Sequence, residues 1–248
     1  METMRLRRTR RDRLRPSSWL LKVTMAVTGL IWVAFVLIHL FGNLKVFSGA
    51  EAFDSYARWL RTAFYPFLPK GFLLWTMRII LIICLLLHVM CAYILWSRGR
   101  KRGSRTTRRS VWSRPTEGQS KIQAVSAALM PLTGVLIFAF IIIHILDLTT
   151  GTPPVATEQF VAATTETSSA YANLVASMQR PVMAGIYALT MALLAVHVFH
   201  GVRTAASDLG TTGHSWRQLF LWTAGLCALV ILLGNGTIPI LVQLGVIQ

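Results

Sequence analysis

The sequence has few acidic residues and little charge of either sign. Only 9 of its 248 residues are Asp or Glu, and charged residues make up 14% of the chain, whereas a soluble domain has about 25%. Hydrophobic residues make up 54%. This composition excludes an intrinsically disordered chain and argues against an ordinary soluble enzyme domain.

Cysteine is also scarce. The three cysteines, Cys84, Cys91 and Cys227, are too few for a disulfide framework, and their spacing matches no zinc pattern. The chain lacks a glycine-rich dinucleotide fingerprint and a cysteine cluster of the ferredoxin type. It therefore carries no flavin or ferredoxin domain of its own.

What the chain does have is long apolar runs. About 20 apolar residues in a helix cross a bilayer core of about 30 Å. Five runs reach that length, at about 20–44, 71–96, 123–148, 181–202 and 219–245, the last passing a Gly-Asn-Gly sequence at 234–236. The first is too long for a signal peptide and lacks a small-residue cleavage site. The sequence predicts an all-α integral membrane protein with five transmembrane helices in residues 20–248, preceded by a basic arm at 1–19.

The basic residues predict the orientation of these helices. Net charge is +16, and Lys and Arg gather in residues 1–22, 98–121 and 203–217, whereas residues 149–179 contain none. Because cytoplasmic loops are rich in Lys and Arg, we expect a bacterial cytoplasmic membrane protein with a cytoplasmic N-terminus and an outer C-terminus. Topology and anionic headgroups explain this charge, so nucleic-acid binding is not expected.

The connecting segments are too short for a soluble catalytic domain. Residues 51–63 alternate apolar and polar side chains with helical period, which predicts an amphipathic helix lying on the outer surface. Residues 150–170 are rich in Thr, Ser, Ala and Pro and are expected to form an outer loop.

Four of the six histidines lie inside predicted membrane helices, one on each of the first four. At 1.5 Å per residue, His39 and His144 lie about 8–9 Å from the outer end of their helices, and His88 and His197 about 9–12 Å from the inner end. Ionisable residues in a membrane are costly and usually functional. The topology therefore sorts the histidines into an outer pair, His39 with His144, and an inner pair, His88 with His197.

Paired imidazoles on facing helices of a bundle are typical axial ligands of haem iron. Two matched pairs predict two b-type haems in a bundle of the first four helices. Histidines that only hydrogen-bond helices together are the simpler explanation for one residue, and a proton relay would need carboxylates that the sequence lacks between the two levels.

Two segments resemble a known family. The first is LIHLFGNLKVFSGAEAFDSYARWLR (37–61), with matching residues His39, Gly42, Asn43, Leu44, Phe47, Gly49 and Tyr56. The second is residues 171–210, with matching residues Tyr171, Val175, Pro181, Tyr187, His197, His200, Gly201 and Gly210. Both resemble the cytochrome b558-type membrane anchor of succinate dehydrogenase and fumarate reductase, in its single-chain, five-helix, di-haem form.

The resemblance implies a membrane anchor for a cytoplasmic flavoprotein subunit and an iron–sulfur subunit. Electrons would pass from the iron–sulfur subunit through haem b to a membrane quinone, and the chain alone would not oxidise succinate. It also implies that His88 and His197 hold the haem nearer the iron–sulfur subunit, and that His197 rather than His200 is the ligand.

The site of the quinone stays open between two locations. The outer location offers Arg78, Asp147 and Asn43 near Asp54 and Tyr56, and the inner one offers His200 and Arg203. We favour the outer site, because an outer haem serves little purpose if electrons leave at the inner level.

Three alternatives remain. The inner haem could be replaced by a [2Fe–2S] centre with mixed His and Cys ligands, drawn from His88 and the cysteines. The chain could be the cytochrome b of another respiratory oxidoreductase. It could also be a transporter or structural membrane protein without a cofactor.

Overall fold

The computed structural model describes residues 16–103, 121–164, 166–211 and 213–248. Most of the predicted basic arm and the basic loop at 104–120 lie outside these ranges. Within the described residues the chain is helical and has no strand, which confirms the predicted all-α fold class.

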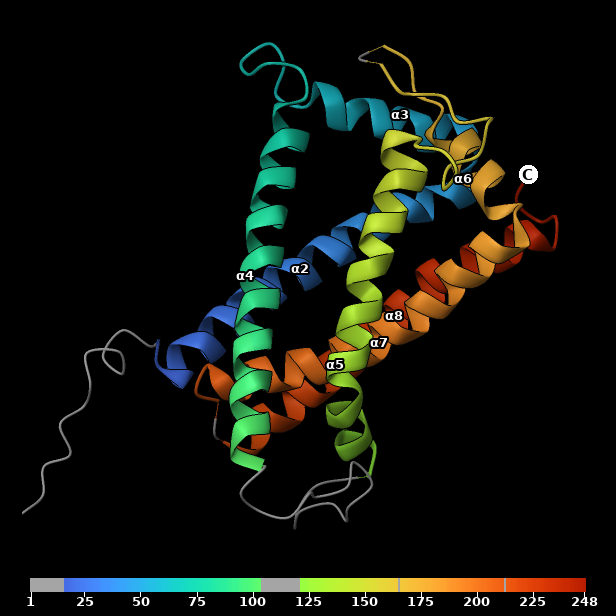
Figure 1. Cartoon of the computed structure of the whole chain (residues 1–248). Helices are drawn as coiled ribbons and strands as arrows, with labels where there is room; N and C mark the ends of the chain where they lie inside the picture. Colours follow the sequence, from blue (N-terminus) through green and yellow to red (C-terminus); the bar gives the residue numbers. More distant parts are fainter. Residues whose placement is uncertain (1–15, 104–120, 165, 212) are drawn as a thin grey trace, which may run out of the picture.

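Five long helices are apolar enough to cross a membrane among the described residues. They are α2 (Ser18–Asn43), α4 (Phe72–Gly103), α5 (Lys121–His144), α7 (Pro181–Asp208) and α8 (His214–Gln243). Helices α2, α5 and α8 run toward the end of the molecule where α3 and α6 lie, and α4 and α7 run away from it (Figure 1). Large apolar side chains such as Trp75, Leu86 and Leu189 are more than half exposed, as expected for helices that face lipid.

Helix α8 continues through the Gly-Asn-Gly sequence without a break. A Cβ atom on Gly234 would lie 2.5 Å from a δ-carbon of Leu40 in α2, so the glycine permits the two helices to approach. The amide of Asn43 donates a hydrogen bond of 2.9 Å to Asn235 at the same crossing. The glycines therefore serve helix packing here rather than ending the helix.

Shorter elements gather at the end where α2 and α5 finish (Figure 1). They are η1 (Leu44–Ser48), the amphipathic α3 (Ala50–Thr62), the π-helical turn η2 (Ile145–Thr150) and α6 (Ala170–Met178). Helix α3 matches the amphipathic helix expected at 51–63. Helix α6 lies just after the expected outer loop and was not predicted.

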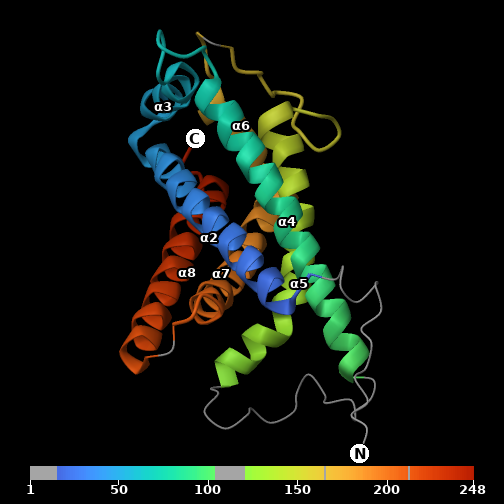
Figure 2. The same ribbon diagram turned by 90° about the vertical axis from the view of Figure 1, so that its left-hand side faces the viewer.

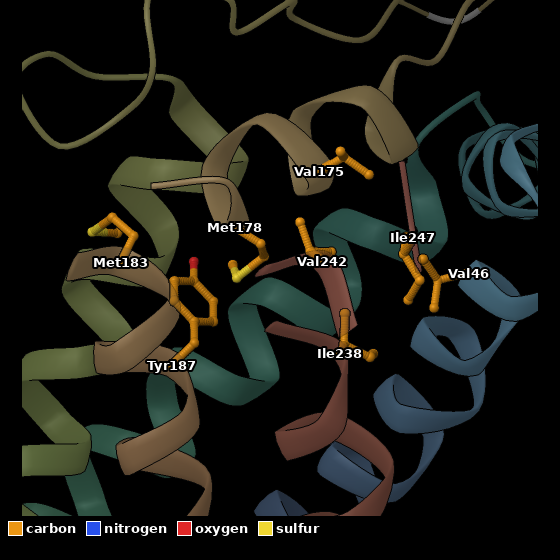
Figure 3. Close-up of a cluster of buried hydrophobic side chains, with 8 residues drawn as sticks. All are labelled: Val46, Val175, Met178, Met183, Tyr187, Ile238, Val242 and Ile247. Carbon is orange, nitrogen blue, oxygen red and sulfur yellow. The ribbon is translucent and has the colours of Figure 1, made fainter. Parts of the chain in front are cut away.

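Helix α7 is the centre of the packing. The most extensive helix contacts are α7 with α8, α2 with α4, α5 with α7, and α2 with α7, and Figure 2 shows α2 lying beside α4. A cluster of buried apolar side chains packs α6, α7 and α8 against one another at the end of the molecule where α3 lies (Figure 3). Its members are Val46, Val175, Met178, Met183, Tyr187, Ile238, Val242 and Ile247.

Candidate functional site

The structure brings the four membrane histidines together in two pairs. The ring centres of His39 and His144 lie 5.9 Å apart, and those of His88 and His197 lie 6.4 Å apart. All four side chains are partly buried. We keep the names outer pair for His39 with His144 and inner pair for His88 with His197.

The two histidines of each pair come from helices that do not pack extensively against each other. His39 and His144 come from α2 and α5, and His88 and His197 come from α4 and α7, whereas the main contacts are α2 with α4, α5 with α7 and α2 with α7. The two pairs therefore span the diagonals of the four-helix bundle.

The inner pair is oriented by neighbouring helices. Nδ1 of His88 lies 3.0 Å from the carbonyl oxygen of Met25, which can only accept a hydrogen bond. Nδ1 of His197 lies 3.1 Å from the hydroxyl of Thr133, and that hydroxyl donates to the carbonyl of Leu129 at 3.0 Å. Both histidines thus carry the proton on Nδ1 and leave the lone pair of Nε2 free.

His144 of the outer pair is oriented through a tyrosine. Its Nδ1 lies 3.3 Å from the hydroxyl of Tyr187, which donates to Oδ2 of Asp147 at 2.9 Å. The tyrosine oxygen can therefore only accept from His144, and the lone pair of this histidine also lies on Nε2.

Glycines give the inner pair its space. A Cβ atom on Gly29 would lie 3.0 Å from Cε1 of His88, and one on Gly134 would lie 3.5 Å from Cε1 of His197. Any larger residue at position 29 would push against the imidazole ring.

Gly29, Thr133 and Gly134 belong to a repeat that the sequence analysis missed. Residues 28–39 read TGLIWVAFVLIH and residues 133–144 read TGVLIFAFIIIH, so the two segments share Thr, Gly, Ala, Phe and His at equivalent positions. The two phenylalanines also act alike: Phe35 stacks on His39 at 5.6 Å, and Phe140 on His144 at 5.8 Å. Aligning the segments around His39 and His144 would have revealed Thr28, Gly29, Thr133 and Gly134.

The residues present fit a metal held between two imidazoles. With metal–nitrogen bonds of about 2.0–2.1 Å, the centres of two imidazoles on opposite faces of one metal lie about 6 Å apart. Both pairs have that separation, and three of the four histidines have an assigned partner for Nδ1, as metal-binding histidines usually do.

A centre with four mixed His and Cys ligands fits the described residues less well than a metal held between two imidazoles. In the described ranges, no three His, Cys, Asp or Glu side chains come together as a metal site would require. Cys84 and Cys91 are buried as free thiols. The described residues therefore do not support the mixed His and Cys centre.

Each of the remaining candidates has its own contacts. Arg78 is exposed on α4, with its guanidinium 5.0 Å from the ring centre of Trp75. Asn43 is used in the contact with α8. Asp147 is only 1% exposed and pairs with Arg180 at 2.6 Å, so it does not face lipid as an outer-edge residue would.

His200 lies one turn beyond His197 on α7. Nδ1 of His200 and Nε of Arg203 are buried and have no hydrogen-bond partner in the described residues. Buried polar atoms are normally paired, so these two nitrogens indicate a polar group that lies outside the described residues.

A family model for the succinate dehydrogenase/fumarate reductase transmembrane subunit matches residues 105–233, which is slightly more than half of the 248 residues. The match includes His144, His197 and most of α8. A search of curated proteins found no match, and a search of solved structures found none either.

Proposed function

Because the chain belongs to the succinate dehydrogenase/fumarate reductase transmembrane subunit family, we propose that it anchors the flavoprotein and iron–sulfur subunits to the membrane. In this proposal it carries electrons from the iron–sulfur subunit through two b-type haems to a membrane quinone.

The observation that carries this proposal is the matched spacing of the two histidine pairs, 5.9 and 6.4 Å between ring centres. Haem held by the two histidines of a pair would supply one-electron transfer. His39 and His144 would hold the outer haem, and His88 and His197 the inner one.

The protein's own residues would prepare these sites before the cofactor binds. Met25, Thr133 and Tyr187 fix the tautomer of three histidines, which leaves Nε2 as the nitrogen that could bind a cofactor. Gly29 and Gly134 keep space beside the inner pair. The unpaired nitrogens of His200 and Arg203 suit the acidic side groups of the inner haem.

We further propose that the cytoplasmic ends of the spanning helices form the docking surface for the iron–sulfur subunit. These are the N-terminus of α2, the C-terminus of α7 and the N-terminus of α8. The inner pair lies only about 9–12 Å from that end, counted at 1.5 Å per residue, so electrons entering there reach the inner haem first.

The quinone would bind at the outer level, at a surface open to lipid, because its apolar body arrives through the bilayer. Arg78 is the exposed polar candidate there, held over Trp75. The rival site is the inner one, where His200 and Arg203 have unpaired buried nitrogens.

A reduced-minus-oxidised optical spectrum of the purified protein tests the haem assignment. Wild-type protein is expected to contain two b-type haems. His39→Ala and His144→Ala should each remove the outer signal, and His88→Ala and His197→Ala the inner one. His214→Ala, at an exposed position, serves as the control. An unchanged haem content in all four variants would refute the proposal.

A further inference from the structure

A buried carboxylate is linked to His144 through the hydroxyl of Tyr187, and the proposed function assigns it no task. Asp147 lies in the π-helical turn η2 and is only 1% exposed. Arg180 donates to Oδ1 at 2.6 Å. Ser177 donates to Oδ2 at 2.5 Å and Tyr187 to the same atom at 2.9 Å.

The direction of each hydrogen bond follows from this arrangement. A carboxylate paired with a guanidinium can only accept, and a phenol has a single proton to give. Tyr187 uses that proton on Asp147, so its oxygen accepts from Nδ1 of His144 at 3.3 Å. The chain of donors therefore runs from His144 through Tyr187 and ends on a negative charge.

Among the described residues, the hydrogen bonds from the inner pair end on neutral groups. The hydrogen bond from His88 ends on the carbonyl of Met25, and the one from His197 reaches Thr133, whose hydroxyl ends on the carbonyl of Leu129. Hydrogen bonds that involve a charged group are about twice as strong as neutral ones, and successive hydrogen bonds polarise one another. The outer and inner pairs thus differ in the group on which the hydrogen bonds from Nδ1 end, a carboxylate for His144 and backbone carbonyls for His88 and His197.

We propose that Asp147, acting through Tyr187, is a positioning residue for His144 that lowers the reduction potential of the outer haem. A stronger acceptor at Nδ1 makes the imidazole a better electron donor through Nε2. A better electron donor stabilises the oxidised iron, and hydrogen bonds around axial ligands are one of the means by which proteins set haem potentials. This inference rests on the proposed function, since it requires that His144 binds haem.

The first test is a potentiometric titration of the purified complex, with the two haems followed by optical spectroscopy and the outer one identified by its loss in His39→Ala. Tyr187→Phe removes only the hydroxyl and keeps the ring that packs edge-on against Phe140 at 4.9 Å. The outer potential should rise and the inner one should not change. Thr133→Val is the matched control, and it should shift only the inner potential.

A second test separates transmission through Tyr187 from a direct effect of charge. Asp147→Asn should raise the outer potential in the wild-type background and have no further effect in the Tyr187→Phe background. Ser177→Ala removes a competing donor from Oδ2 and leaves the charge in place. It should therefore strengthen the bond from Tyr187 and shift the outer potential downward.

These outcomes distinguish the inference from the function on which it rests. Wild-type protein without haem would refute the proposed function itself. Two normal haem signals with an unchanged outer potential in Tyr187→Phe would overturn the inference alone, and so would an upward shift in Ser177→Ala. If Tyr187→Phe fails to retain the outer haem, the opposite signs expected for Asp147→Asn and Ser177→Ala decide the question, and equal signs overturn it.

Discussion

The hydroxyl of Thr133 lies 3.1 Å from Nδ1 of His197 and joins α5 to α7 beside the inner pair. Thr28 occupies the equivalent place in α2, where its hydroxyl lies 3.4 Å from Nδ1 of His88. Each of these two histidines is therefore contacted by a threonine on a neighbouring helix. The residue after each threonine is a glycine, which leaves room for the imidazole ring.

Thr133→Val should weaken the inner haem site while leaving the outer one intact. The substitution keeps the side-chain shape but removes the acceptor for Nδ1 of His197, and losing such a partner typically costs metal sites about 10–100-fold in affinity. The measurement is the rate at which haem transfers from the purified protein to an excess of an apo haem protein.

Thr190→Val is the control for that experiment. Thr190 is also buried, but among the described residues its hydroxyl bonds only to the carbonyl of Ile186 within its own helix. Equal rates of haem loss in the two variants would show that the histidine contact is unimportant.

Gly29→Val should prevent the inner haem from binding. The first carbon of the new side chain would already lie 3.0 Å from Cε1 of His88, and its two methyl groups would displace the ring. The optical spectrum should retain only the outer haem. Gly185→Val is the matched control, because a Cβ atom there has no neighbour within 4 Å. Loss of both haems in both variants would indicate a general effect of valine on helix stability.

The fold was predictable because it depends on composition over long segments. Five apolar runs and the distribution of Lys and Arg are properties of 20 or more residues each, so they predict spanning helices without knowledge of tertiary contacts. Helix ends depend on single contacts. Contacts between helices do so too: the run at 219–245 was expected to pass Gly234, but its close approach to Leu40 in α2 follows from no local pattern.

The candidate site was predictable only in part, for the same reason. The depth of His39 and His144 follows from counting residues along their helices, and so does that of His88 and His197. The partners of Asp147 cannot be found by counting residues along a helix. Arg180 and Ser177 follow Asp147 by 33 and 30 residues, and they reach it because α6 and the start of α7 fold back over η2.

Arg180→Ala should destabilise the protein much more than Lys22→Ala. The carboxylate of Asp147 is fully buried and would lose its charged partner, whereas Lys22 is half exposed in its pair with Asp208. Breaking a buried ion pair typically lowers the free energy of unfolding by about 3–5 kcal/mol. Because Arg180 is partly exposed, we expect a loss near the lower end of that range. A surface pair contributes about 0–1 kcal/mol. Thermal unfolding in detergent would measure the difference, and similar unfolding temperatures for the two variants would contradict it.

The last prediction concerns the quinone site. Arg78→Ala should lower the rate of quinone reduction by succinate in the assembled complex, because the exposed guanidinium on α4 is the polar group available to a quinone carbonyl at the outer level. Arg58→Ala is a control, since Arg58 bonds to Ser55 on the exposed surface of α3. The variants should first show two normal haem signals, so that a lost rate reflects the quinone step. His200→Ala tests the rival inner site in the same way. If the rate is normal in Arg78→Ala and lost in His200→Ala, the quinone binds beside the inner pair, where the unpaired nitrogens of His200 and Arg203 would then receive it.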